Sequence, residues 1–209
     1  MEISKLDRKQ SYVGNTIKVF ISYANEDKES ASCVKDFLEK YGIEVFLAHE
    51  DINPTEKWEG IILRKLDACD IFMPLLTENF KKSDWTNQET GIALAKNKWI
   101  IPIKIEIDPY GFIWKIQALK LNNSEIEKCY PKILDVICNN KNFTESLKDC
   151  LIKGFVNSSS FKSAEILAEE LDKFDFFKPE QIREIFRGSI YPEFDTPQVF
   201  SLAFENRNR

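Results

Sequence analysis

From residue 17 onward the chain alternates short apolar runs with segments whose apolar residues recur every three or four positions. Apolar runs separated by helix-period segments are typical of parallel strands covered by helices. We therefore predict an α/β fold with a parallel sheet of five strands. The expected strands span residues 17–23, 43–47, 70–76, 99–107 and, on a weaker signal, 117–121.

Three helices are predicted between these strands, over residues 25–42, 58–69 and 83–97. Asn25 is the expected N-cap of the first helix, and Gly42 stands where that helix should stop. Either Ser83 or Asp84 can cap the third helix. Pro102 predicts that the fourth strand lies near the edge of the sheet, because proline cannot donate a ladder hydrogen bond.

Beyond residue 140 the strand signals disappear, and short helices are predicted over residues 144–155, 160–174 and 179–187. Ten of the sixteen phenylalanines lie after residue 140, whereas all four tryptophans lie before residue 115. This shift in composition predicts two parts. Residues 13–140 form the α/β domain, and residues 141–209 form an all-helical C-terminal extension that packs on it.

Charge and composition argue against several classes of protein. The net charge of −5 argues against binding to nucleic acid or to anionic membranes. Five cysteines without a CxxC spacing and a single histidine, His49, make a disulfide framework and a metal site improbable. Without a signal peptide or a long apolar run, the chain is expected to be cytoplasmic and not to enter a membrane.

Ligands of a parallel sheet bind at the carboxyl ends of its strands, so the loops there are the place to look for a site. No GxGxxG or GxxxxGK[ST] string is present, and the acidic residues of a phosphoacceptor domain are missing from the strand ends. A nucleophile activated by histidine would have to use His49, and no GxSxG turn accompanies it.

The segment SDWTNQET remains, in which Trp85 and Glu89 are four residues apart. On a helix these two side chains share one face. The spacing alone fits two interpretations: a functional pair, or a core tryptophan beside a solvated glutamate.

Blocks of sequence in a fixed order resemble a Toll/interleukin-1 receptor (TIR) domain of the bacterial kind. They read VFISYANEDKE, GIEVFLAHEDINP followed by W..II..L..CD, LLTENFKKSDWTNQE and IIPI, and they extend over roughly residues 17–121. The resemblance implies a flavodoxin-like sheet of five parallel strands. It also implies cleavage of NAD⁺ at the nicotinamide N-glycosidic bond, with Glu89 as the catalytic residue and Trp85 as the tryptophan of its W-x-x-x-E motif.

The same resemblance implies further site residues. Phe20 and Ser22 would border the nicotinamide and its ribose. The loop of residues 47–57 would contact other TIR domains during self-association. It lacks the glycine common in such loops, and no arginine follows it at residues 58–60. The residues of this loop that the resemblance assigns to self-association are His49, Glu50, Asp51, Asn53 and Pro54.

The expected function is therefore that of an NAD⁺ nucleosidase that yields nicotinamide and either ADP-ribose or a cyclic isomer. NAD⁺ is its substrate, and no separate cofactor or metal is expected. The resemblance further implies a bacterial defence effector that self-association activates. Two alternatives remain open: a non-catalytic module that acts by homotypic TIR contacts, and a related N-glycosidase or deoxyribosyltransferase that acts on nucleosides.

Overall fold

A computed structural model describes residues 14–48, 58–121 and 126–189. Its strands form a parallel sheet in the order β2-β1-β3-β5-β6, and β4 also pairs with β3. This order confirms the predicted α/β, flavodoxin-like fold with five parallel strands. The strands are β1 (Lys18–Ser22), β2 (Glu44–Leu47), β3 (Ile71–Leu76), β4 (Trp99–Ile100), β5 (Ile103–Lys104) and β6 (Leu119–Lys120).

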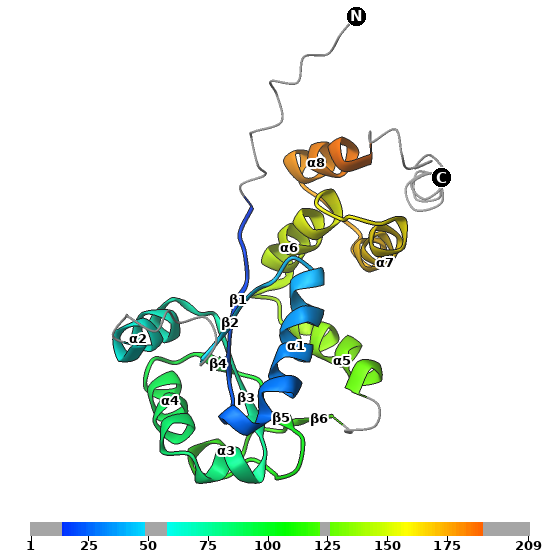
Figure 1. The fold of residues 1–209 in the computed structure, drawn as a ribbon. Coiled ribbons are helices and arrows are strands. Elements are labelled where there is room, and N and C mark those ends of the chain that lie inside the picture. Colours follow the sequence, from blue (N-terminus) through cyan, green and yellow to red (C-terminus); the bar gives the residue numbers. More distant parts are fainter. Residues whose placement is uncertain (1–13, 49–57, 122–125, 190–209) are drawn as a thin grey trace, which may run out of the picture.

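Helices cover both faces of the sheet (Figure 1). Apolar residues of α2 and α4 form one core with the sheet, whereas those of α1, α5, α6 and α7 form the other. The helices are α1 (Lys28–Lys40), α2 (Trp58–Ala68), α3 (Glu78–Lys82), α4 (Asp84–Ala95), α5 (Ile126–Asn139), α6 (Thr144–Val156), α7 (Phe161–Asp172) and α8 (Pro179–Ser189); the 3₁₀ turns are η2 (Asn25–Asp27) and η3 (Gly111–Ile113).

The predicted helices are all present, but the first begins later than expected. Asn25 is not an N-cap, because residues 25–27 form the 3₁₀ turn η2 and Asp27 precedes the first residue of α1. The amide of Asp27 donates to the Ala24 carbonyl at 2.8 Å, which closes this turn before the α-helix begins.

The fourth strand lies near the edge of the sheet, as Pro102 predicts, because β5 is next to the edge strand β6. Proline also interrupts this strand, because its missing amide falls in the gap between β4 and β5. The Pro102 carbonyl still accepts from the Leu119 amide at 2.8 Å, which joins β5 to β6. The strand also ends before Ile105, since the amides of residues 105–107 all approach the Leu76 carbonyl.

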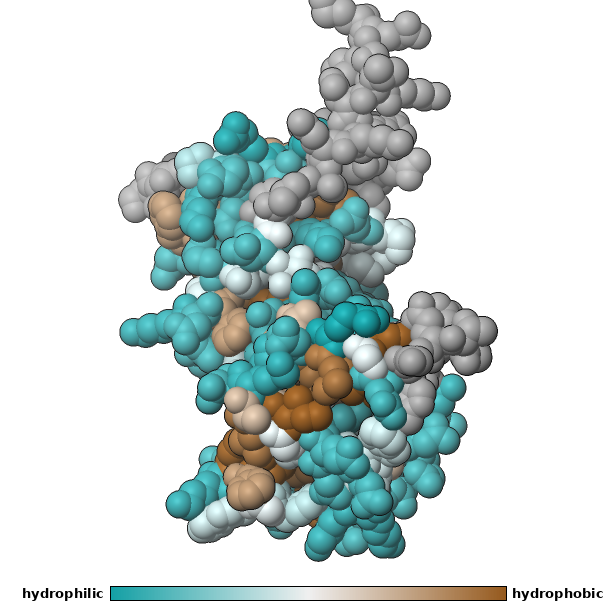
Figure 2. Space-filling view, turned by 90° about the vertical axis from the view of Figure 1, so that its left-hand side faces the viewer, coloured by the Kyte–Doolittle hydropathy of each residue, from teal (hydrophilic) through white to brown (hydrophobic). Residues whose placement is uncertain are grey.

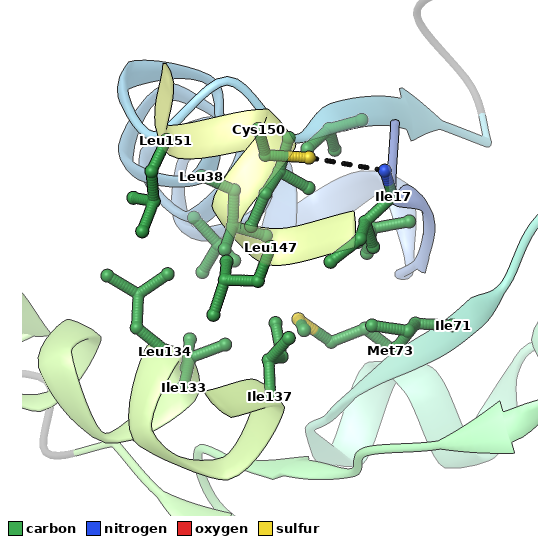
Figure 3. Close-up of a cluster of buried hydrophobic side chains, with 14 of the residues drawn as sticks. Ile17, Leu38, Ile71, Met73, Ile133, Leu134, Ile137, Leu147, Cys150 and Leu151 are labelled. Carbon is green, nitrogen blue, oxygen red and sulfur yellow. Dashed lines mark hydrogen bonds between the residues drawn. The ribbon is translucent and has the colours of Figure 1, made fainter. Parts of the chain in front are cut away.

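The C-terminal helices pack on the α/β part at the amino end of β1. The Ile17 amide donates to Cys150 Sγ of α6 at 3.3 Å, among buried leucines and isoleucines (Figure 3). Asp149 accepts from the Asn15 amide at 2.9 Å and from Gln181 Nε2 of α8 at 2.7 Å. Figure 1 shows α6–α8 at one end of the molecule and α3 and α4 at the other. The division at residues 140 and 141 stays a prediction.

Gly42 is where α1, β2 and α6 meet. Its φ is +74°, and the Ile43 amide donates to the Leu38 carbonyl at 3.3 Å, as in a Schellman cap. A Cβ at residue 42 would lie 2.0 Å from the Cys150 carbonyl oxygen of α6. The glycine therefore permits both the turn and the close approach of α6.

We predict that Gly42→Ala lowers the free energy of unfolding by about 3 kcal/mol, because the left-handed φ and the clash with α6 both oppose the new methyl group. Chemical denaturation followed by circular dichroism measures this change. Gly91→Ala in α4 is the matched control, because a Cβ there meets nothing within 4 Å. This variant should gain up to about 1 kcal/mol from helix propensity. Equal stability of the two variants would contradict the packing described here.

Candidate functional site

Ser22 and Glu89 meet at the carboxyl edge of the sheet. Ser22 is the last residue of β1, next to β3, and Glu89 lies near the middle of α4. The Ser22 hydroxyl donates to Glu89 Oε2 at 2.5 Å. Both side chains are buried, with 0% and 1% of their surfaces exposed. The structure thus brings together two residues that the sequence placed 67 positions apart.

The direction of Glu89 is set by how α4 begins. Ser83 separates α3 from α4, and its hydroxyl caps α4 by accepting from the Thr86 amide. The Thr86 hydroxyl donates to the Phe80 carbonyl of α3 at 2.6 Å. Thr86, Glu89 and Ala93 are the buried residues of α4, so one stripe of the helix faces the sheet. Because Glu89 falls on this stripe, its carboxyl points inward.

The Glu89 carboxyl has an unusual electrostatic environment. Burial raises its pKa from 4.5 to about 7, and the hydrogen bond from Ser22 opposes this rise. Its second oxygen, Oε1, is buried and has no hydrogen-bond partner among the described residues. A buried carboxyl with an unpartnered oxygen and a raised pKa is a common feature of catalytic sites, although structural networks can also perturb pKa values.

Trp85 lies one turn before Glu89 on α4, and 38% of its surface is exposed. The interpretation of the pair as a core tryptophan beside a solvated glutamate is therefore wrong. The structure reverses it, because the glutamate is buried and the tryptophan reaches the surface.

Phe20 lies two residues before Ser22 on β1 and is fully buried. Its ring lies 5.2 Å from that of Phe46 and 5.8 Å from that of Phe72, between centroids. These rings form the apolar core beneath the end of the strand. The contact of Phe20 with nicotinamide stays a prediction.

The self-assembly loop residues His49, Glu50, Asp51, Asn53 and Pro54 lie outside the described residues. Within residues 14–48, 58–121 and 126–189, no group of three or more His, Cys, Asp or Glu side chains could hold a metal ion. Each helix in these same ranges is too short or too polar to cross a bilayer.

A polar cluster at the same edge was not singled out from the sequence. The Thr77 hydroxyl donates to Asp27 Oδ2 at 2.5 Å, and Asn79 Nδ2 donates to Asp27 Oδ1 at 3.4 Å. Thr77 also caps α3 by accepting from the Phe80 amide. These bonds join the 3₁₀ turn η2, which follows β1, to the helix α3, which follows β3. Thr77 followed by Glu78 could have indicated the helix cap, because threonine is a favoured N-cap residue. The contact with Asp27 could not be predicted in this way, because Asp27 is 50 residues away in the sequence.

A separate hollow of about 240 Å³ lies along another side of α4. Asn87, Thr90 and Gly91 line it from the helix, and Tyr110 and Phe112 line it from the segment around η3. Figure 2 shows an apolar patch on the side of the molecule where α2 and α4 lie. None of the predicted site residues lines this hollow, so it is distinct from the Ser22–Glu89 pair.

A family model described as TIR domain matches residues 19–134, which is more than half of the chain. No curated protein gives a significant match. Among solved structures, the TIR domain of a Toll-related receptor from Hydra magnipapillata is 22% identical with a TM-score of 0.50; the match covers 58% of this chain and 98% of that one. At this identity the likeness shows the fold alone.

Two other solved structures are similar over comparable lengths. A CMP N-glycosidase from Clostridium botulinum is 23% identical with a TM-score of 0.42, and the match covers 56% of this chain and 98% of that one. The TIR domains of the activated Roq1 resistosome are 15% identical with a TM-score of 0.42, with coverages of 76% and 99%. These TM-scores are too low for a comparison of sites.

We predict that Glu89→Gln is more stable than the wild-type protein and that this difference in stability grows as the pH rises. A carboxyl with a raised pKa in the folded state costs stability above its unfolded pKa of about 4.5, and the cost is complete above about pH 7. A shift of this size corresponds to roughly 3 kcal/mol. Melting temperatures of both proteins between pH 4 and pH 9 test this prediction. The advantage of the glutamine variant should grow between pH 4.5 and 7 and then level off; a constant difference would contradict the burial of an ionisable carboxyl.

Proposed function

Because the chain belongs to the TIR domain family, we propose that it is an NAD⁺ nucleosidase that cleaves the bond between nicotinamide and ribose. The observation that carries this proposal is the Glu89 carboxyl. It is buried at the carboxyl edge of the sheet, bonded to Ser22 through one oxygen and unpartnered at the other. Ligands of open parallel sheets bind at this edge.

One carboxylate is enough for this reaction. Ordinary glycosidases use two carboxyl groups, one of which protonates a poor leaving group. In NAD⁺ the C1′–N bond breaks with its electron pair moving to the pyridinium nitrogen, so nicotinamide leaves as a neutral molecule without a proton donor. The remaining task is to stabilise positive charge at C1′, which ionised Glu89 performs while it accepts hydrogen bonds from the ribose hydroxyls.

The cation at C1′ is then captured by a nucleophile. Attack by water forms ADP-ribose and releases a proton, whereas attack by an adenine nitrogen forms a cyclic isomer. Burial of Glu89 strengthens its attraction for the cation, because the effective dielectric constant of a protein interior is lower than that of water. The apolar rings around Phe20 maintain this environment beneath the end of β1.

The other predicted residues receive roles consistent with their places in the structure. Ser22 would border the ribose beside Glu89, and the exposed Trp85, one turn before Glu89 on α4, offers a rigid surface for substrate. Self-association through His49, Glu50, Asp51, Asn53 and Pro54 would assemble the active enzyme. A cytoplasmic defence effector is the cellular role that we propose for it.

A second candidate is a non-catalytic module that acts through homotypic TIR contacts. One observation favours it: Glu89 is only 1% exposed, so this conformation does not present the carboxyl to a substrate. For the nucleosidase, the site must therefore open before NAD⁺ can bind.

We predict that concentrated protein releases nicotinamide from NAD⁺ and that Glu89→Gln reduces this release at least a thousandfold, because the neutral amide cannot stabilise the cation. Chromatography of reaction mixtures measures the products. The charge-matched control is the double variant Gln88→Glu/Glu89→Gln, which moves the carboxylate to the exposed neighbouring position. This variant should be equally inactive.

Three outcomes would contradict the proposal. Wild-type turnover by Glu89→Gln would remove Glu89 from the mechanism. Release of a free base from nucleosides, with NAD⁺ left intact, would select a nucleoside N-glycosidase. Inertness toward all of these substrates at high protein concentration would select the interaction module.

A further inference from the structure

The two oxygens of the Glu89 carboxyl group have different surroundings. Oε2 accepts the Ser22 hydroxyl at 2.5 Å, whereas Oε1 is buried without a hydrogen-bond partner among the described residues. A buried oxygen that lacks a partner loses its hydration without compensation. This arrangement is costly for stability, and it leaves one acceptor ready for an incoming hydroxyl group.

We propose that Ser22 is a positioning residue for the Glu89 carboxyl: its hydroxyl fixes Oε2 and thereby sets the direction in which Oε1 is presented. This inference rests on the nucleosidase proposed above. It adds a specific role for Ser22, which acts through Glu89 and not on the bond that breaks.

Ser22 is suited to this role by its backbone. It ends the central strand β1, which pairs with β2 on one side and β3 on the other, and Ser22 itself is in register with Pro74. Its side chain is 0% exposed, so water does not compete for the hydroxyl. A short side chain on a paired strand has little freedom, and a group fixed in this way holds its partner at low entropic cost.

Within the described part of the chain, Ser22 holds the Glu89 carboxyl without help from a charged group. The elements packed against α4, the helix of Glu89, are β1, β3, α2 and α3, and β3 carries no titratable residue. Burial raises the pKa of Glu89, and the hydrogen bond from Ser22 lowers it. No charged group of the described residues contributes to the shift. The exposed charged residues of the other packed elements and of α4 itself are Lys18, Glu59, Arg64, Lys65, Asp67, Glu78, Lys81, Lys82 and Asp84.

Loss of the Ser22 hydroxyl should therefore act through the ionisation of Glu89. A hydrogen bond to an ionised group corresponds to a pKa change of about one unit or more. If ionised Glu89 is the active form, kcat/KM rises with pH and levels off above about pH 7. In Ser22→Ala this rise moves to higher pH by about one unit, which is a tenfold loss of kcat/KM at pH 6 and a smaller loss at pH 9.

The test compares Ser22→Ala, Ser22→Cys and Thr90→Ala. Cysteine is a weaker donor of similar shape and should give an intermediate shift. Thr90→Ala removes a hydroxyl of the same helix that donates to the Thr86 carbonyl and not to Glu89, and it should leave the pH profile in place. A uniform loss of rate at every pH in Ser22→Ala, with no shift of the profile, would overturn the proposal.

Melting temperatures test the same coupling without any enzymatic activity. The destabilisation caused by Ser22→Ala should widen above pH 7, where the wild-type carboxyl is ionised and the variant carboxyl still loses stability as it ionises. In a Glu89→Gln background this pH dependence should vanish. If both results hold but no NAD⁺ is cleaved, the proposed function fails while the positioning by Ser22 stands. If the pH dependence persists in the Glu89→Gln background, the positioning role is wrong.

Discussion

The Glu89 carboxyl is removed from water between α4 and the sheet, with a serine hydroxyl as its hydrogen-bond partner. Removing a carboxylate from water costs free energy that the rest of the fold must offset. The aromatic rings of Phe20, Phe46 and Phe72 contribute to that compensation on the same side of the sheet. This costly group lies at the edge where ligands of parallel sheets bind, and the proposed function gives a reason for its presence there.

The two ends of β1 serve different purposes. At its amino end, Ile17 is bonded to α6, and Asp149 joins the preceding residue Asn15 to α8. At its carboxyl end, Ser22 holds Glu89. The helices after residue 140 therefore stabilise the central strand from the end opposite the candidate site. Because they pack there, α6–α8 leave the carboxyl edge to α3, α4 and the loops (Figure 1).

Periodicity in the sequence predicted the sheet and most helices, because these elements bury one face and their apolar spacing records it. It did not predict α3, whose five residues are too few to show a period and whose cap, Thr77, is fixed by Asp27. It also missed α5, where Pro131 lies inside the helix and interrupts the expected pattern. Pro102 correctly indicated a strand near the edge of the sheet, but the division of that strand into β4 and β5 was not predicted.

For the candidate site, the spacing of Trp85 and Glu89 placed the two on one helix face but could not say which of them is buried. That depends on the tertiary packing of α4, which Ser83 and Thr86 set through α3. The pairing of Ser22 with Glu89 depends on strand order, which the local sequence does not record. The pKa of Glu89 depends on burial, which only the assembled fold reveals.

In the proposed mechanism, the unpartnered oxygen of Glu89 accepts a hydroxyl of the NAD⁺ ribose. A crystal structure with an analogue of NAD⁺ whose N-glycosidic bond cannot break tests it most directly. A ribose hydroxyl should lie within hydrogen-bond distance of Oε1, with C1′ beside the carboxyl and Ser22 still bonded to Oε2. An analogue bound elsewhere, with Glu89 still buried beneath α4 and touching only Ser22, would contradict the proposed role of Glu89.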